Sequence, residues 1–286
     1  KKNINMIKQN PFSIYDFLGY LVPGSILIYA YLIIDFLKKT KTFNLNTFID
    51  NFSNFKFEGI FFFIILSYTL GHLISFASSI TIEKYATWRY NYPSKYLLNM
   101  EHKGYFKSSK NWKDVIWRIA MIILLFPCVI FDLIFGQILG FKRFYTSPLD
   151  NFLQTFIYFK LNCLVKKLGI DKIEGYEKYN KGKGNNYDFH RIATHYAYEN
   201  SKNHQQKMSN YVALYGFLRA LCLIFNLTAI YFTIRICLYL EFNFVNTFIL
   251  ILLSGLSYLS FMAFMKFYRR YSLEGLMVIT IDPNLK

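Results

Sequence analysis

Long apolar stretches alternate with short polar and basic segments along this chain of 286 residues. Charged side chains are absent from residues 17–34, and between 59 and 82 the only side chain that titrates near neutral pH is His72. About 20 apolar residues in a helix cross the hydrocarbon core of a bilayer, whereas a soluble helix is interrupted by polar residues every few positions. The pattern predicts an all-α, polytopic membrane protein. Its apolar runs are residues 17–37, 59–82, 115–139, 212–240 and 244–265.

The third run, residues 115–139, differs from the others. It contains Pro127 and Asp132, and both residues are costly in a simple spanning helix. If this run crossed the bilayer, the basic segment 140–210 would lie outside the cell. We therefore expect four transmembrane helices plus a membrane-embedded or interfacial hairpin at 115–139. Five spans are the alternative.

Basic residues are distributed unevenly between the runs. Lys and Arg number seven in residues 84–114 and twelve in 140–210, whereas 241–243 have none. Loops rich in Lys and Arg stay in the cytoplasm. The distribution predicts a multi-pass protein of the cell inner membrane with both termini in the cytoplasm and residues 38–58 outside.

These features divide the chain into three segments. Residues 1–83 hold the N-terminal cytoplasmic segment and the first two transmembrane helices, and 84–211 form a basic helical cytoplasmic region that includes the embedded hairpin. Residues 212–286 hold the last two transmembrane helices and a basic tail. A helical pattern that starts at Asp188 runs without proline into the fourth apolar run, which predicts one continuous helix from the basic region into the membrane.

The basic region offers candidate ligand-binding residues. The stretch "NKGKGNN" contains Lys181 and Lys183 and precedes the predicted helix, whose N-terminus favours anions. On that helix, Arg191 and His195 lie four residues apart and share one face, and His190 lies beside them. We expect these residues to contact an anionic ligand. A flexible loop followed by a solvated, salt-bridged face is the alternative.

Polar residues within the apolar runs are candidates for a pore or its gate. Arg219 and Arg235 lie about 24 Å apart along one helix, so they reach either opposite interfaces or an oligomer axis. Stripes of small residues pack helices closely or line a polar pathway. The candidates are His72, Asp132, Arg219, Arg235, Ser254 and Ser257.

Signatures of enzymes and cofactors are missing from the sequence. It has no HExxH, no GxSxG and no paired acidic cluster. The cysteines show no spacing suited to a metal and are expected to be small buried hydrophobic residues; they are Cys128, Cys163, Cys222 and Cys237. We therefore expect no catalytic residue, no metal and no cofactor.

Three stretches carry a resemblance to a known group: "YDFLGYLVPG" at 15–24, "YTLGHLISFASSITIEK" at 68–84, and "YVALYGFLRALC" at 211–222. Together they resemble membrane effectors of bacterial antiphage defence, of the Hailong channel type. The resemblance implies a homo-oligomeric channel whose cytoplasmic part binds an oligonucleotide or nucleotide made by a partner enzyme and gates the pore. A tetramer is the expected assembly.

Two other functions fit the same sequence. A membrane scaffold or anchor would use the basic face to bind anionic lipid or a partner protein. An intramembrane enzyme or transporter would need a water-filled cavity around His72 within one subunit.

Overall fold

The computed structural model describes residues 16–40, 47, 57–109, 111–169, 189–240 and 242–285. Within these residues the chain is helical and contains no strand. Four helical stretches are long and apolar enough to cross a membrane, which confirms the predicted multi-span helical membrane protein; they are Phe17–Lys39, Glu58–Tyr96, His204–Leu238 and Phe244–Ile281.

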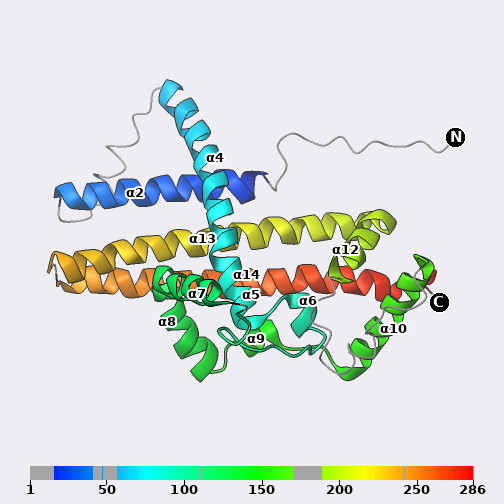
Figure 1. Cartoon of the computed structure of the whole chain (residues 1–286). Coiled ribbons are helices and arrows are strands. Elements are labelled where there is room, and N and C mark those ends of the chain that lie inside the picture. The colour runs from blue at the N-terminus through cyan, green and yellow to red at the C-terminus, as the bar shows by residue number, and fades with distance from the viewer. Residues whose placement is uncertain are drawn as a thin grey trace.

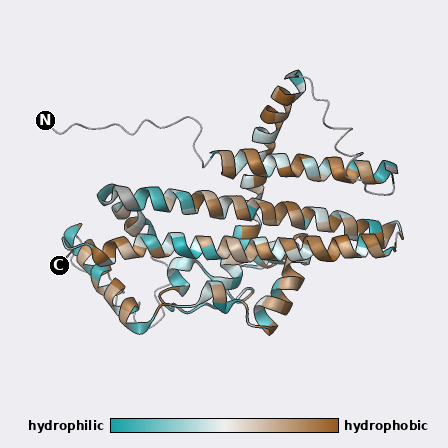
Figure 2. Cartoon of the chain, turned by 180° about the vertical axis from the view of Figure 1, so that it is seen from behind, coloured by the Kyte–Doolittle hydropathy of each residue, from teal (hydrophilic) through white to brown (hydrophobic). Residues whose placement is uncertain are grey.

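The longest elements are α13 (Lys202–Leu238) and α14 (Phe244–Ile281), which form an antiparallel pair (Figure 1). They contain 37 and 38 residues, so each extends about 55 Å, well beyond a hydrocarbon core of about 30 Å. Their apolar residues gather toward the turn between them, and polar residues gather toward the opposite end (Figure 2). The half next to the turn therefore has the composition of a membrane-spanning segment.

The N-terminal part consists of a π-helical turn, η1 (Phe17–Leu21), followed by α2 (Val22–Thr40) and α4 (Phe57–Ile80). Figure 1 shows α2 running alongside α13, whereas α4 crosses both helices steeply. The first half of α4 stands clear of the other helices in this view and exposes large apolar side chains such as Phe61 and Phe62.

Two glycines permit the crossing of α2 and α4. A Cβ added to Gly24 would lie 1.7 Å from the carbonyl oxygen of Ser67, and one added to Gly71 would lie 1.9 Å from that of Tyr20. No larger residue fits such backbone contacts. In this part of the chain the small residues serve helix packing, which the sequence left open.

The bent hairpin expected at residues 115–139 is present. It consists of α7 (Trp112–Leu124), α8 (Phe126–Phe131) and the π-helical η2 (Asp132–Ile138). The two arms meet at an angle of 86°. Pro127 lies in the first turn of α8, where its missing N–H costs little.

Shorter helices collect around the polar half of α14. They are α5 (Ile82–Tyr90), α6 (Pro93–Tyr96), α9 (Arg143–Thr146), α10 (Asn151–Lys167) and α12 (Phe189–Asn200). The side chain of Asp150 caps α10 by accepting from the Leu153 N–H at 2.9 Å.

The prediction of one continuous helix from the basic region into the membrane is wrong. Ser201 has an extended backbone, with φ −142° and ψ 98°, and separates α12 from α13. The break lets α12 fold onto α14, where Ala197 packs with Met208 and Val278. Burial of this small-residue face on α14 outweighs the local preference for an uninterrupted helix. Asp188 itself lies outside the described residues.

Candidate functional site: a polar hub on α5

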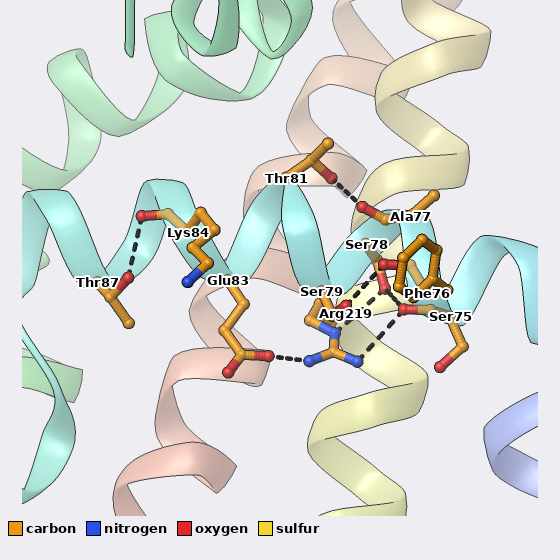
Figure 3. Close-up of polar contacts among 10 residues, drawn as sticks. All are labelled: Ser75, Phe76, Ala77, Ser78, Ser79, Thr81, Glu83, Lys84, Thr87 and Arg219. Carbon is orange, nitrogen blue, oxygen red and sulfur yellow. Dashed lines mark hydrogen bonds and ion pairs between the residues drawn. The ribbon is translucent and has the colours of Figure 1, made fainter. Parts of the chain in front are cut away.

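A buried arginine joins α13 to the junction between α4 and α5. Arg219 is 9% exposed, and its Nη1 donates to the carboxylate of Glu83. Its Nε donates to Ser78 Oγ at 3.1 Å, and its Nη2 reaches the carbonyl oxygen of Ser75 at 3.4 Å (Figure 3). A guanidinium away from water needs a counter-ion and further acceptors, and this site supplies both.

The break between α4 and α5 helps to build this site. Thr81 interrupts the helix with φ −112° and ψ −78°, and its hydroxyl donates to the carbonyl oxygen of Ala77 at 2.7 Å (Figure 3). Ser75 and Ser78 precede the break and Glu83 follows it, and the Ser75 carbonyl oxygen, the Ser78 hydroxyl and the Glu83 carboxylate all contact Arg219. The polar atoms at the junction are therefore used for an interhelical contact.

A second polar cluster lies on the same short helix, around Asp132 of η2. This carboxylate is fully buried. It accepts hydrogen bonds from the hydroxyls of Tyr85 at 2.7 Å, Tyr90 at 2.5 Å and Tyr145 at 3.3 Å. Three neutral donors around one carboxylate stabilise its charge without an ion pair.

Hydrogen bonds connect Asp132 to a half-buried lysine. Gln137 Nε2 donates to the Tyr90 hydroxyl at 2.8 Å, and Lys142 Nζ donates to Gln137 Oε1 at 3.1 Å. Gly136 leaves room for the carboxylate, because a Cβ there would lie 2.5 Å from Asp132 Oδ1. The cluster therefore fixes the second arm of the hairpin to α5.

The bend of the hairpin is held from α13 by Asn226, which is fully buried. Its Nδ2 donates to the carbonyl oxygen of Leu124 at 2.9 Å, and its Oδ1 accepts from the Cys128 N–H at 3.3 Å. A bend inside a bilayer leaves backbone groups without helical partners. One amide side chain satisfies an acceptor and a donor on the two sides of this bend.

We define the α5 hub as Glu83, Tyr85 and Tyr90 together with their partners Arg219 and Asp132. Through it, nine residues of α5 connect α13 to the embedded hairpin. The hub suits mechanical coupling between these elements. The described residues contain no group of three or more His, Cys, Asp or Glu side chains placed to hold a metal ion.

Among the pore candidates, Arg219 and Asp132 thus belong to the interior of one subunit. Ser257 is buried and donates to the carbonyl oxygen of Cys222 on α13 at 3.0 Å, and Ser254 donates to Leu250 within α14 at 2.7 Å. Both serines lie at the packed faces of α14.

The remaining pore candidates lie at the periphery. His72 is exposed, and its ring stacks on Tyr20 with centroids 3.7 Å apart. Arg235 lies in the last turn of α13 and is half-buried. These two residues do not converge with the hub.

The ligand-binding candidates of the basic region lie on α12. Arg191 and His195 are exposed, whereas His190 is half-buried and its ring contacts Tyr271 edge-on with centroids 6.0 Å apart. Lys181 and Lys183 lie outside the described residues.

Sequence reasoning missed several residues of the hub and of the hairpin bend. Glu83 directly follows the second apolar run, and Asn226 interrupts the fourth. An acidic residue at the end of one run and an arginine within another are a signal for interhelical pairing. The tyrosines around Asp132 give no such signal among the 24 in the chain.

Comparisons with protein-family models, curated proteins and solved structures find no match. The composition, the four long apolar helices and the bent hairpin identify the chain as a multi-pass helical membrane protein.

Proposed function

We propose that this protein is an oligomeric ion channel or membrane-disrupting effector that is controlled from the cytoplasm by an anionic nucleotide or oligonucleotide, in bacterial antiphage defence. The α5 hub carries the proposal. It connects α13 with the bent hairpin through an ion pair and a buried hydrogen bond, both made by α5.

The basic region supplies the ligand-binding element. Exposed Arg191 and His195 on α12 face solvent, where a polyanion reaches them. The Cγ2 atom of Thr194, a buried residue of the same helix, lies 3.9 Å from a Cβ built on Gly275 of α14. Ligand binding therefore acts on α14 through packing, since α12 and α13 are separate helices.

Transmission to the membrane runs through α14 and α13. These helices pack along their length, so a shift of their polar halves changes the position of Arg219 relative to Glu83. Rotation of α5 then moves Asp132 and the hairpin. In a homo-oligomer, for which we propose a tetramer of the cell inner membrane with both termini cytoplasmic, the same shift in each subunit widens a shared pathway.

The experiment is single-channel recording of the purified protein in planar bilayers, with and without short oligonucleotides and at two salt gradients. Discrete conductance that responds to the oligonucleotide is the expected result, and the reversal potential gives the ion preference. An Arg191→Gln/His195→Gln variant is expected to conduct but to lose the response. A Lys166→Gln/Lys266→Gln variant serves as the control for loss of positive charge elsewhere.

Silence of a folded, oligomeric protein in all conditions would contradict the channel function. It would favour a scaffold or anchor. Conductance without any response to oligonucleotides would retain the pore and refute nucleotide control.

A further inference from the structure

Large aromatic side chains are exposed where the embedded hairpin begins. Trp112 is 68% exposed, Trp117 48% and Phe106 45%. The exposed apolar face of α7 continues toward the bend through Ile116, Ile119 and Ile123. Tryptophan rings concentrate at the headgroup level of membranes, so the start of α7 has the features of a helix that enters the bilayer from its surface.

Lysines surround these aromatic residues. Lys103, Lys107 and Lys113 are exposed, and the sequence from 101 to 114 has four lysines against two acidic residues, Glu101 and Asp114. Lys113 Nζ lies 5.9 Å from the ring centroid of Trp112. We call Lys103, Phe106, Lys107, Trp112, Lys113 and Trp117 the α7 patch.

A buried arginine fixes the loop of the patch against the helix. Arg118 is 4% exposed, and its Nη1 donates to Ser108 Oγ at 2.7 Å. The Tyr105 hydroxyl donates to the Arg118 carbonyl oxygen at 3.0 Å, and burial raises the pKa of Tyr105 to about 12, which keeps this donor neutral. The Arg118 guanidinium lies 4.9 Å from the Trp88 ring centroid. Phe106 and Lys107 are thus held beside the first turns of α7.

We propose that the α7 patch binds the headgroups of anionic phospholipids. The aromatic rings rest at the headgroup level because the apolar face of the same helix continues into the hairpin, and the lysines then meet the lipid phosphates. A zwitterionic lipid accommodates the aromatic rings equally well, but it attracts the lysines less because it carries no net negative charge. This proposal does not depend on the channel function.

The sequence permits a direct optical test. The chain has three tryptophans, two in the patch and the third, Trp88, packed beside Arg118, so intrinsic fluorescence reports on this region alone. The full chain is reconstituted in nanodiscs that contain either brominated phosphatidylglycerol or brominated phosphatidylcholine at the same mole fraction. We expect the anionic lipid to quench at least about twofold more strongly, since each lysine near the surface adds attraction.

Three variants locate the effect. Lys103→Gln/Lys107→Gln/Lys113→Gln is expected to quench equally with both lipids, whereas the matched control Lys84→Gln/Lys166→Gln/Lys266→Gln keeps the preference. Trp112→Phe/Trp117→Phe leaves Trp88 as the reporter and is expected to lose most of the quenching.

Several results would overturn the proposal. Equal quenching of the wild-type protein by the two lipids would show that the patch does not prefer anionic headgroups. Absence of quenching by either lipid would show that the patch does not contact the bilayer. Retained preference in the patch variant assigns it to other lysines. An oligonucleotide that abolishes quenching at physiological salt shows that the patch binds nucleic acid instead.

Discussion

Arg219 and Glu83 form an ion pair inside the helical body although they lie 136 residues apart in the sequence. Arg219 comes from the middle of α13, and Glu83 comes from the first turn of α5. The pair links the α13–α14 hairpin to the N-terminal helices. Its loss is therefore expected to affect both stability and coupling.

Removal of one partner tests the pair. Arg219→Leu is expected to lower the free energy of unfolding by about 3 kcal/mol, because Glu83 is left without its counter-ion in a poorly solvated position. The double variant Arg219→Leu/Glu83→Leu is expected to be less unstable than the sum of the single variants. Unfolding in mixed micelles measures the free energy of unfolding of Arg219→Leu, of Glu83→Leu and of the double variant. Strictly additive losses would show that the two side chains do not interact.

The tyrosine cluster around Asp132 predicts a different effect. Asp132→Leu removes the acceptor of three buried hydroxyls, and each buried donor left unsatisfied costs about 1–3 kcal/mol. We expect the hairpin to separate from α5 before the protein unfolds. Cys128 is buried in the hairpin, so its rate of maleimide labelling should rise at least tenfold. Unchanged labelling in this variant would mean that Asp132 does not hold the hairpin.

Asn226 is expected to stabilise the bend of the hairpin. Asn226→Leu leaves the Leu124 carbonyl and the Cys128 N–H without their partner, and we expect a loss of about 1–2 kcal/mol. Thr228→Val is the matched control, since the Thr228 hydroxyl bonds only within α13. Equal effects of the two substitutions on thermal stability would refute a special role for Asn226.

His102 predicts a loss of stability in mild acid. Burial lowers the pKa of His102, whose Nε2 bonds to the Trp88 carbonyl oxygen at 3.0 Å. The unfolded chain therefore binds the proton first, near pH 6.5, and stability falls from that pH down to the lower pKa of the folded state. His102→Gln should flatten this part of the profile. Thermal unfolding between pH 5 and pH 7.5 provides the measurement.

Asp282 affects the free energy of unfolding at lower pH than His102 does. A hydrogen bond from the Tyr196 hydroxyl, at 2.5 Å, lowers the pKa of Asp282. Its contribution is present above the ordinary carboxyl pKa of about 4 and is lost as the pH falls through the folded value. Tyr196→Phe should remove this part of the acid sensitivity and leave stability at pH 7 within about 1 kcal/mol. A wild-type acid profile in Tyr196→Phe would contradict the assignment.

The sequence predicted the membrane helices and the bent hairpin well, because each depends on local composition. Pro127 and Asp132 marked the exceptional run, and the structure places a bend of 86° there. The prediction of one helix through residue 201 failed because local pattern does not report that α12 buries Ala197 against α14.

The candidate site was predicted only in part. Arg219 and Asp132 were identified because charged groups are rare in apolar runs. Glu83, Tyr85 and Asn226 were missed because their hydrogen-bonding partners lie on helices that are distant in the sequence.

By itself, the sequence determined that the chain is a helical membrane protein with a basic part, since lipid requires long apolar helices and excludes unpaired charge. Tertiary structure decided which polar residues meet. The close approach at Gly24 and Gly71 sets how α2 and α4 cross, and α4 leads into α5, where Glu83 meets Arg219 and Tyr85 meets Asp132. Such pairings arise from the packing of whole helices, which no local pattern encodes.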